Sequence, residues 1–106
     1  MKFHITREAC CSQDDQVGPL AFLCELNAEA TLRDLTDAVL RSGFLQFTST
    51  HSVMVAEVGN DAMVRVFSPH AGYPRSPQYL KAADLLARTL VGPGELHFRF
   101  PFDFKG

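Results

Sequence analysis

The sequence predicts an α+β fold in which two helices pack on one face of a mainly antiparallel sheet. Three observations predict it: short runs alternate between apolar and polar residues, two longer runs carry apolar residues at helical spacing, and turn residues separate the runs. The predicted elements follow the order ββαββαβ. From residue 20 onward the order is βαββαβ, the split βαβ order of the ferredoxin-like architecture, so the first strand would be an added edge.

A β-grasp-like fold is the alternative, because in that fold an N-terminal hairpin precedes the first helix. Residues 2–7 and 20–26 would form this hairpin, although the connection between them is long for one. In either fold the chain of 106 residues fits a single domain, 1–106. A chain of this length buries roughly two-thirds of its unfolded surface, so it needs no disulfide or metal ion to fold.

The first two predicted strands differ in how their apolar residues are arranged. In residues 2–7, Phe3 and Ile5 lie on one face and polar residues lie on the other, which is typical of a half-buried strand. Residues 20–26 are rather apolar on both faces, which favours a central strand covered on at least part of both sides.

Residues 31–43 predict the first helix. Thr31 is a good N-cap, and Asp34 three residues later comes close to a capping box. Leucine and valine recur at helical spacing, and Gly43 is expected to end the helix in the left-handed conformation.

Three further strands are predicted from alternation and from turn residues. Residues 44–50 and 53–58 form one strand, continuous or broken in two, and a Gly-Asn-Asp turn joins it to residues 62–67 as a hairpin. Residues 95–105 alternate most regularly of all. Because Pro101 has no N–H to donate, this last strand either ends near Phe100 or continues as an edge.

The second helix is predicted between the hairpin and the last strand. Ser76 is a natural N-cap, Pro77 a natural first helical residue, and Gly92 with Pro93 stops the helix. Its apolar stripe would consist of Leu80, Ala83, Leu86 or Ala87, and Leu90.

Composition excludes several classes of function. The formal net charge is −2 and the basic residues are scattered, which does not support a nucleic-acid partner. No apolar stretch approaches about 20 residues, so no membrane span is expected. The N-terminus lacks the apolar region of a secretory signal, which makes the cytoplasm the expected compartment. We expect no cofactor, because the Gly92-Pro93-Gly94 run lacks the lysine and the following helix of a phosphate-binding loop.

The three cysteines do not predict a disulfide framework or a metal site. Their number is odd, and their spacing lacks the paired C-x₂₋₄-C pattern of zinc ligands. Cys10 and Cys11 are expected to be reduced thiols at a strand end. Cys24 lies on an apolar strand face, which indicates a small core residue.

The histidines suggest at most a polar contact surface. His4 and His97 lie on the polar faces of their predicted strands, and they would come close together if those strands are neighbours. With Lys2 and Arg99 nearby, this face would be polar. His51 lies among serines and threonines, which favour a turn or an irregular strand.

The segment 67–77, with the sequence FSPHAGYPRSP, holds the candidate binding residues His70, Tyr73 and Arg75. Its prolines stiffen the backbone and lower the entropy cost of any contact that it makes. Tyrosine and arginine are enriched at interface hot spots. Arg75 would also lie just before a helix N-terminus, where the side chain and free N–H groups can bind a small anionic ligand.

The sequence therefore favours a small non-enzymatic protein–protein interaction module, such as an adaptor, an inhibitor or immunity-type protein, or a regulatory protein. It would act through residues 70–75 and through open sheet edges, which accept an added strand or a second copy of the chain. Phe102 and Phe104 also need a cover, from the chain's own core or from a partner.

The alternative is a small-molecule or anion-binding domain, or a small enzyme, with its site beside residues 70–75 and His70 as acid or base. An enzyme is the less favoured hypothesis, because no set of catalytic groups converges in the sequence.

Overall fold

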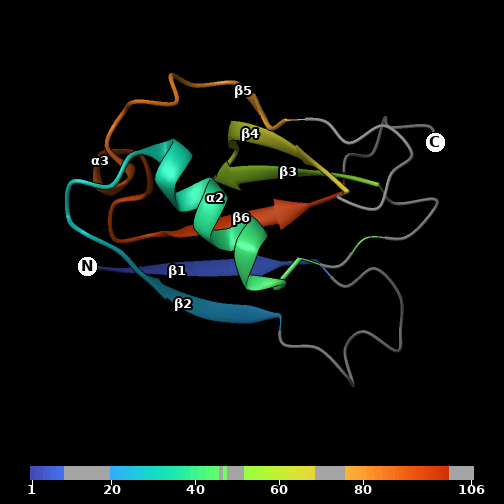
Figure 1. The fold of residues 1–106 in the computed structure, drawn as a ribbon, viewed down its shortest axis with the longest axis horizontal. Coiled ribbons are helices and arrows are strands. Elements are labelled where there is room, and N and C mark those ends of the chain that lie inside the picture. The colour runs from blue at the N-terminus through green and yellow to red at the C-terminus, as the bar shows by residue number, and fades with distance from the viewer. Residues whose placement is uncertain (9–19, 46, 48–51, 69–75, 101–106) are drawn as a thin grey trace.

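A mixed sheet of six strands, in the order β2-β1-β6-β3-β4-β5, forms one layer of the computed structural model, and helix α2 crosses one face of it obliquely (Figure 1). The structure describes residues 1–8, 20–45, 47, 52–68 and 76–100. The elements in chain order are β1 (Lys2–Arg7), β2 (Ala21–Glu25), α2 (Leu32–Ser42), β3 (Val53–Val58), β4 (Asp61–Phe67), β5 (Gln78–Tyr79), α3 (Ala87–Val91) and β6 (Glu95–Arg99). The predicted α+β class is confirmed.

The strand order differs from the ferredoxin-like prediction. That prediction puts the strand of residues 20–26 inside the sheet and the strand of residues 2–7 at its edge. In the structure β1 lies between β2 and β6, pairing antiparallel with β2 and parallel with β6, and β2 is the edge strand. The antiparallel β1–β2 pair that precedes α2 is the hairpin on which the β-grasp-like alternative depends.

The exchange of β1 and β2 has a physical reason in their side chains. Phe3 and Ile5 on β1 are almost completely buried, whereas Leu23 on β2 is 52% exposed. The apolar pattern of residues 20–26 therefore overstates burial, because one of its faces is exposed at a sheet edge. Hydrophobic residues on a strand indicate that at least one of its faces is covered. The pattern alone does not show whether both faces are covered.

Helix α2 forms as its sequence predicts. The Asp34 backbone N–H donates to the Thr31 hydroxyl at 3.2 Å, and the Thr31 N–H donates to the Asp34 carboxylate at 3.0 Å, which completes the capping box. At the other end Gly43 has a φ of 74°, a left-handed conformation that a glycine adopts at little cost. The helix therefore begins directly after Thr31 and ends directly before Gly43.

The core lies between α2 and the sheet face that it covers. Four sheet strands, β1, β3, β4 and β6, alternate so that every second side chain points toward α2. The buried side chains from these strands include Phe3, Ile5, Met54, Ala56, Val64, Val66, Leu96 and Phe98, and those from the helix are Leu32, Leu35, Thr36 and Val39. Cys24 is buried in the same core, as predicted.

The predicted hairpin is present as β3 and β4. Gly59 has a φ of 62° at the turn, which allows the chain to reverse tightly. The predicted strand of residues 44–50 is not seen where the structure describes it: Phe44 and Leu45 are buried outside any strand, and residues 46 and 48–50 lie outside the described residues. The last strand ends at Arg99, and Pro101 also lies outside the described residues.

The long second helix predicted from Pro77 is wrong. Residues 78–79 form strand β5 beside β4, and only the short helix α3 forms before Gly92. Between them, the carbonyls of Ala83 and Leu85 accept hydrogen bonds from the first two helical N–H groups of α2, at 3.0 and 2.9 Å. These donors have no partner within their own helix, so the segment, which bends and turns at residues 83–84, stabilises α2 as a non-helical strap.

None of the helices in the described ranges has the length and apolar character needed to span a membrane.

Tyr79 provides a test of this strap, because β5 places it against α2. Burial raises the pKa of Tyr79 above its ordinary value of 10.0; Asp37 also raises it, and Thr36 and Arg33 oppose the rise. A phenol with a raised folded pKa stabilises the fold fully below pH 10 and loses that contribution as the pH rises through the folded value. Urea unfolding at about pH 9 and about pH 11 should therefore show a smaller loss of stability in Tyr79→Phe than in the wild type. Equal losses in the two proteins would contradict the packing of Tyr79 on α2.

Candidate functional site

The candidate residues His70, Tyr73 and Arg75 lie outside the described residues, as do Cys10, Cys11 and His51. The absence of a helix at Pro77 nevertheless bears on one argument. The predicted anion binding by Arg75 depends on a helix N-terminus that begins at Pro77, and residues 78–79 form a strand there instead. That part of the support for a small anionic ligand is removed.

The clearest candidate surface among the described residues is the outer edge of β2. The N–H of Leu26 donates to the Met1 carbonyl at 2.9 Å, and the N–H of Arg7 donates to the Leu20 carbonyl at 3.0 Å. In an antiparallel pair the inward-bonding residues alternate. Leu20, Phe22, Cys24 and Leu26 therefore bond to β1, and the backbone groups of Ala21, Leu23 and Glu25 point to the outer edge.

No other strand of the described ranges pairs with this edge. The N–H and C=O groups of Ala21, Leu23 and Glu25 thus form a short template for an added strand. The side chains of the same three residues are exposed on the sheet face that α2 does not cover, which we call the open face. Leu23 is the most exposed of the large hydrophobic residues of the described chain.

On the other face of β2, side chains pack toward the helix. Phe22 contacts Phe44, which follows α2, with ring centroids 4.7 Å apart. Cys24 is buried, and burial raises the pKa of its thiol, so Cys24 is a poor nucleophile. The contact between Phe22 and Phe44 places the C-terminal end of α2 beside the start of β2.

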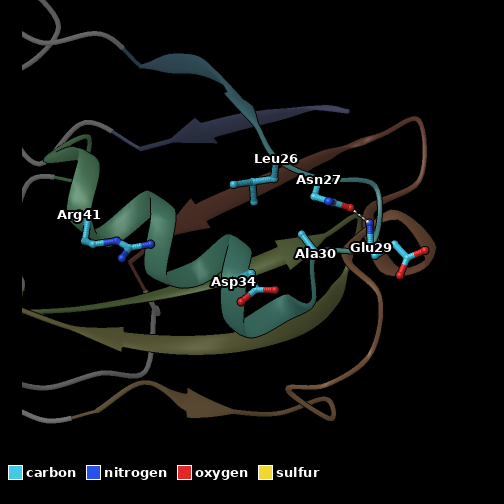
Figure 2. Close-up of a pocket in the computed structure, with 6 residues that line it drawn as sticks. All are labelled: Leu26, Asn27, Glu29, Ala30, Asp34 and Arg41. Atoms are coloured by element: carbon cyan, nitrogen blue, oxygen red, sulfur yellow. Dashed lines mark hydrogen bonds between the residues drawn. The ribbon is translucent and has the colours of Figure 1, made fainter.

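A cleft of about 600 Å³ lies along α2 next to the connection that follows β2 (Figure 2). It is lined by Leu26, Asn27, Glu29, Ala30, Asp34 and Arg41. Figure 2 shows Arg41 at one end of the cleft and Glu29 at the other, with Leu26 between them. The cleft is therefore positively charged near the end of α2 and negatively charged near the connection to β2.

Local structure fixes the two ends of this cleft. The Asn27 side chain accepts a hydrogen bond from the Glu29 N–H at 2.8 Å, which holds the connection in a turn. Asp34 is held by the capping box, and Arg41 lies seven residues later on the same side of the helix. The charges of the cleft thus lie on well-defined backbone, although Glu29, Asp34 and Arg41 are themselves exposed.

A row of polar side chains crosses the open face through the centre of the sheet. The strand registers put His97 opposite Thr6 on one side and opposite Glu57 on the other. The Thr6 hydroxyl and the His97 Nδ1 atom are 2.8 Å apart in a hydrogen bond, and Arg99 Nε donates to Glu57 Oε2 at 2.8 Å. These side chains are partly buried, so the row is ordered and still accessible.

The strands that carry His4 and His97 are neighbours, which is the condition on which their closeness was predicted, because β1 and β6 pair. His4 lies opposite Glu95, one row away from the Thr6–His97 bond. The order hydroxyl, imidazole, carboxylate resembles a catalytic set, but the carboxylate of Glu57 is bonded to Arg99. The row is suited to donating and accepting hydrogen bonds with a partner surface.

A buried arginine lies at the end of β1. Arg7 is almost completely buried, its guanidinium lies 5.3 Å from the centre of the Phe44 ring, and it donates to the Glu8 carbonyl at 3.3 Å. A cation over an aromatic face is attracted by the ring quadrupole. Arg7 therefore joins the end of β1 to the chain that follows α2.

Within the described parts of the chain, no group of three or more histidine, cysteine, aspartate or glutamate side chains is placed to hold a metal ion.

Sequence reasoning missed the β2 edge and the cleft. Residues 20–26 looked buried, and a helix stripe of Asp34 and Arg41 looks like any solvated face. The only signal in the sequence was the β-grasp-like alternative, which makes the strand of residues 20–26 one half of an N-terminal hairpin.

The chain matches no protein-family model, no curated protein and no solved structure.

The Glu57–Arg99 pair should contribute measurably to the order of the open face. The two side chains are only 17% and 28% exposed, so water screens the pair less than a surface pair. A double-mutant cycle with Glu57→Gln and Arg99→Met should give a coupling free energy of about 1 kcal/mol in urea unfolding. The control is the Asp61–Lys81 pair, with side chains 60% and 37% exposed, which should couple by less than about 0.5 kcal/mol. Equal coupling in the two pairs would contradict an ordered polar row.

Proposed function

We propose that the protein is a small non-enzymatic protein–protein interaction module of the cytoplasm, with a β-grasp-like fold. It acts as an adaptor, an inhibitor or immunity-type protein, or a regulatory protein. Binding occurs by strand addition to the outer edge of β2, together with His70, Tyr73 and Arg75. The single observation that carries the proposal is the outward direction of the Ala21, Leu23 and Glu25 backbone groups, with Leu23 exposed beside them.

Strand addition uses both parts of this edge. Backbone hydrogen bonds to Ala21, Leu23 and Glu25 supply affinity that depends little on the partner's sequence. Side chains of the added strand alternate between the two faces. One set lies beside Leu23 on the open face, and the other points toward the helix side, where the cleft lies. These side-chain contacts supply specificity.

The alternative is a small-molecule or anion-binding domain, or a small enzyme, beside residues 70–75. It is the weaker proposal, because the helix N-terminus that was to complete an anion site with Arg75 is replaced by β5. The polar row on the open face supports contact with a protein as well as it supports a small-molecule site. Glu57 forms an ion pair with Arg99 and so does not complete a catalytic set with His97.

The proposal is tested by Leu23→Pro. Because the Leu23 N–H points outward, proline there removes an edge donor without removing a hydrogen bond of the β1–β2 ladder. Affinity capture from the native host, read by mass spectrometry, should recover a stoichiometric protein with the wild type and at least about tenfold less of it with Leu23→Pro.

Leu85→Lys is the control, since Leu85 is an exposed leucine away from the β2 edge and should leave capture unchanged. Circular dichroism and melting temperature are measured to check that each variant is folded. Equal recovery with Leu23→Pro and the wild type would overturn binding by this edge. If recovery instead depends on His70, Tyr73 and Arg75 alone, measured with alanine at all three, the site is that segment.

A further inference from the structure

We infer that the partner of the β2 edge is a second copy of this chain, paired β2 to β2 antiparallel about a two-fold axis at Leu23. The inference rests on the proposed function of this edge and names its partner. Three observations carry it: the register of the outward backbone groups, the exposure of Leu23, and the opposite charges at the two ends of the cleft.

The backbone register is self-complementary. The outward groups belong to Ala21, Leu23 and Glu25, and an antiparallel ladder joins such residues in hydrogen-bonded pairs. With Leu23 opposite Leu23, each Ala21 lies opposite a Glu25, and all three outward residues of both copies are paired. No two like charges lie opposite each other in this register. Like charges in opposite positions would destabilise the ladder.

The same register covers the exposed leucine. Leu23 is 52% exposed, and its cross-strand neighbour on the open face is His4. Placed on the two-fold axis, the two Leu23 side chains pack against each other, and apolar surface is removed from water. An open sheet edge is a liability that a protein covers or pairs, and a two-fold contact covers both edges in one step.

The cleft is also self-complementary about this axis. The C-terminal end of α2 lies beside the start of β2, because Phe22 contacts Phe44 at 4.7 Å between ring centroids. Antiparallel pairing brings the chain that follows Glu25 of the second copy alongside that end. Arg41 of one copy then faces Glu29 of the other, and the reciprocal pair forms by symmetry.

A second copy accounts for these features better than an unrelated extended peptide. A peptide added to β2 would need an acidic group near Arg41 and a basic group near Glu29 to match the cleft. A copy of this chain carries the matching charges in the required order. Two such contacts per dimer reinforce the short ladder, which is limited to the residues of β2.

The test is the mass of the full chain in solution, by sedimentation equilibrium from about 1 µM to about 1 mM, the range in which small interfaces associate. The wild type should rise from 11.7 kDa toward twice that value as concentration increases. Leu23→Lys places two ammonium groups together on the axis and should weaken association at least about tenfold. Leu85→Lys is its matched control and should associate like the wild type, because Leu85 is an exposed leucine away from this edge.

A charge exchange tests the geometry. Arg41→Glu and Glu29→Arg each oppose like charges across the axis and should weaken association severalfold. The double variant restores opposite charges and should recover it. Both residues are exposed, so the variants are expected to fold, which melting temperature checks.

A wild type of 11.7 kDa at every concentration would overturn the inference, as would a double variant no better than the single variants. If the wild type is monomeric but Leu23→Pro still loses a different captured protein, the second copy is refuted and the proposed function stands. If the wild type and the Leu23→Lys variant dimerise equally strongly, the β2 edge is not the dimer contact.

Discussion

The parallel pairing of β1 with β6 is the interaction on which the other features of the structure depend. It joins strands from opposite ends of the chain; Thr6 and His97, which hydrogen-bond across it, are 91 residues apart. The pairing brings Phe3 and Ile5 beside Leu96 and Phe98, all buried under α2. Closing so large a loop costs conformational entropy, which the removal of these side chains from water offsets.

Three consequences follow from this pairing. It puts β1 inside the sheet, so β2 becomes an edge with outward backbone groups and the exposed Leu23. It brings His97 between Thr6 and Glu57, which creates the polar row of the open face. It also places the connection from β2 to α2 beside the helix, where the charged cleft forms. The proposed interaction edge is thus a product of the strand order.

The parts of the fold that the sequence predicts well are those that local chemistry determines. The capping residues Thr31 and Asp34 define the start of α2, and a glycine turn defines the β3–β4 hairpin. Strand order is not local, because a period of two shows that a strand has an apolar face and does not identify its neighbour. The helix predicted from Pro77 is wrong for the same reason, because a non-local contact decides the structure there. The first turn of α2 needs carbonyl acceptors, and the segment supplies them in place of forming a helix.

The candidate site was predicted less well than the fold. Exposed backbone at an edge has no signature in the side chains, and Leu23 reads as a core residue in any run of apolar residues. The position of His4 and His97 on neighbouring strands follows from the sequence only on the condition that β1 and β6 pair. The sequence gives no indication that Arg41 and Glu29 belong to one site, since they come together only in the cleft that the folded chain forms.

Amide hydrogen exchange along β1 and β2, followed by NMR, tests the central claim most directly. The measurement uses the Arg41→Glu variant, because this substitution weakens the proposed contact between two β2 edges. With β1 between two strands, its amides should be protected at every position of the strand. In β2, the amides of Phe22 and Cys24 should be protected, and those of Ala21, Leu23 and Glu25 should exchange quickly. Alternating protection in β1 together with continuous protection in β2 would contradict this account, because it would make β1 the edge and β2 an interior strand.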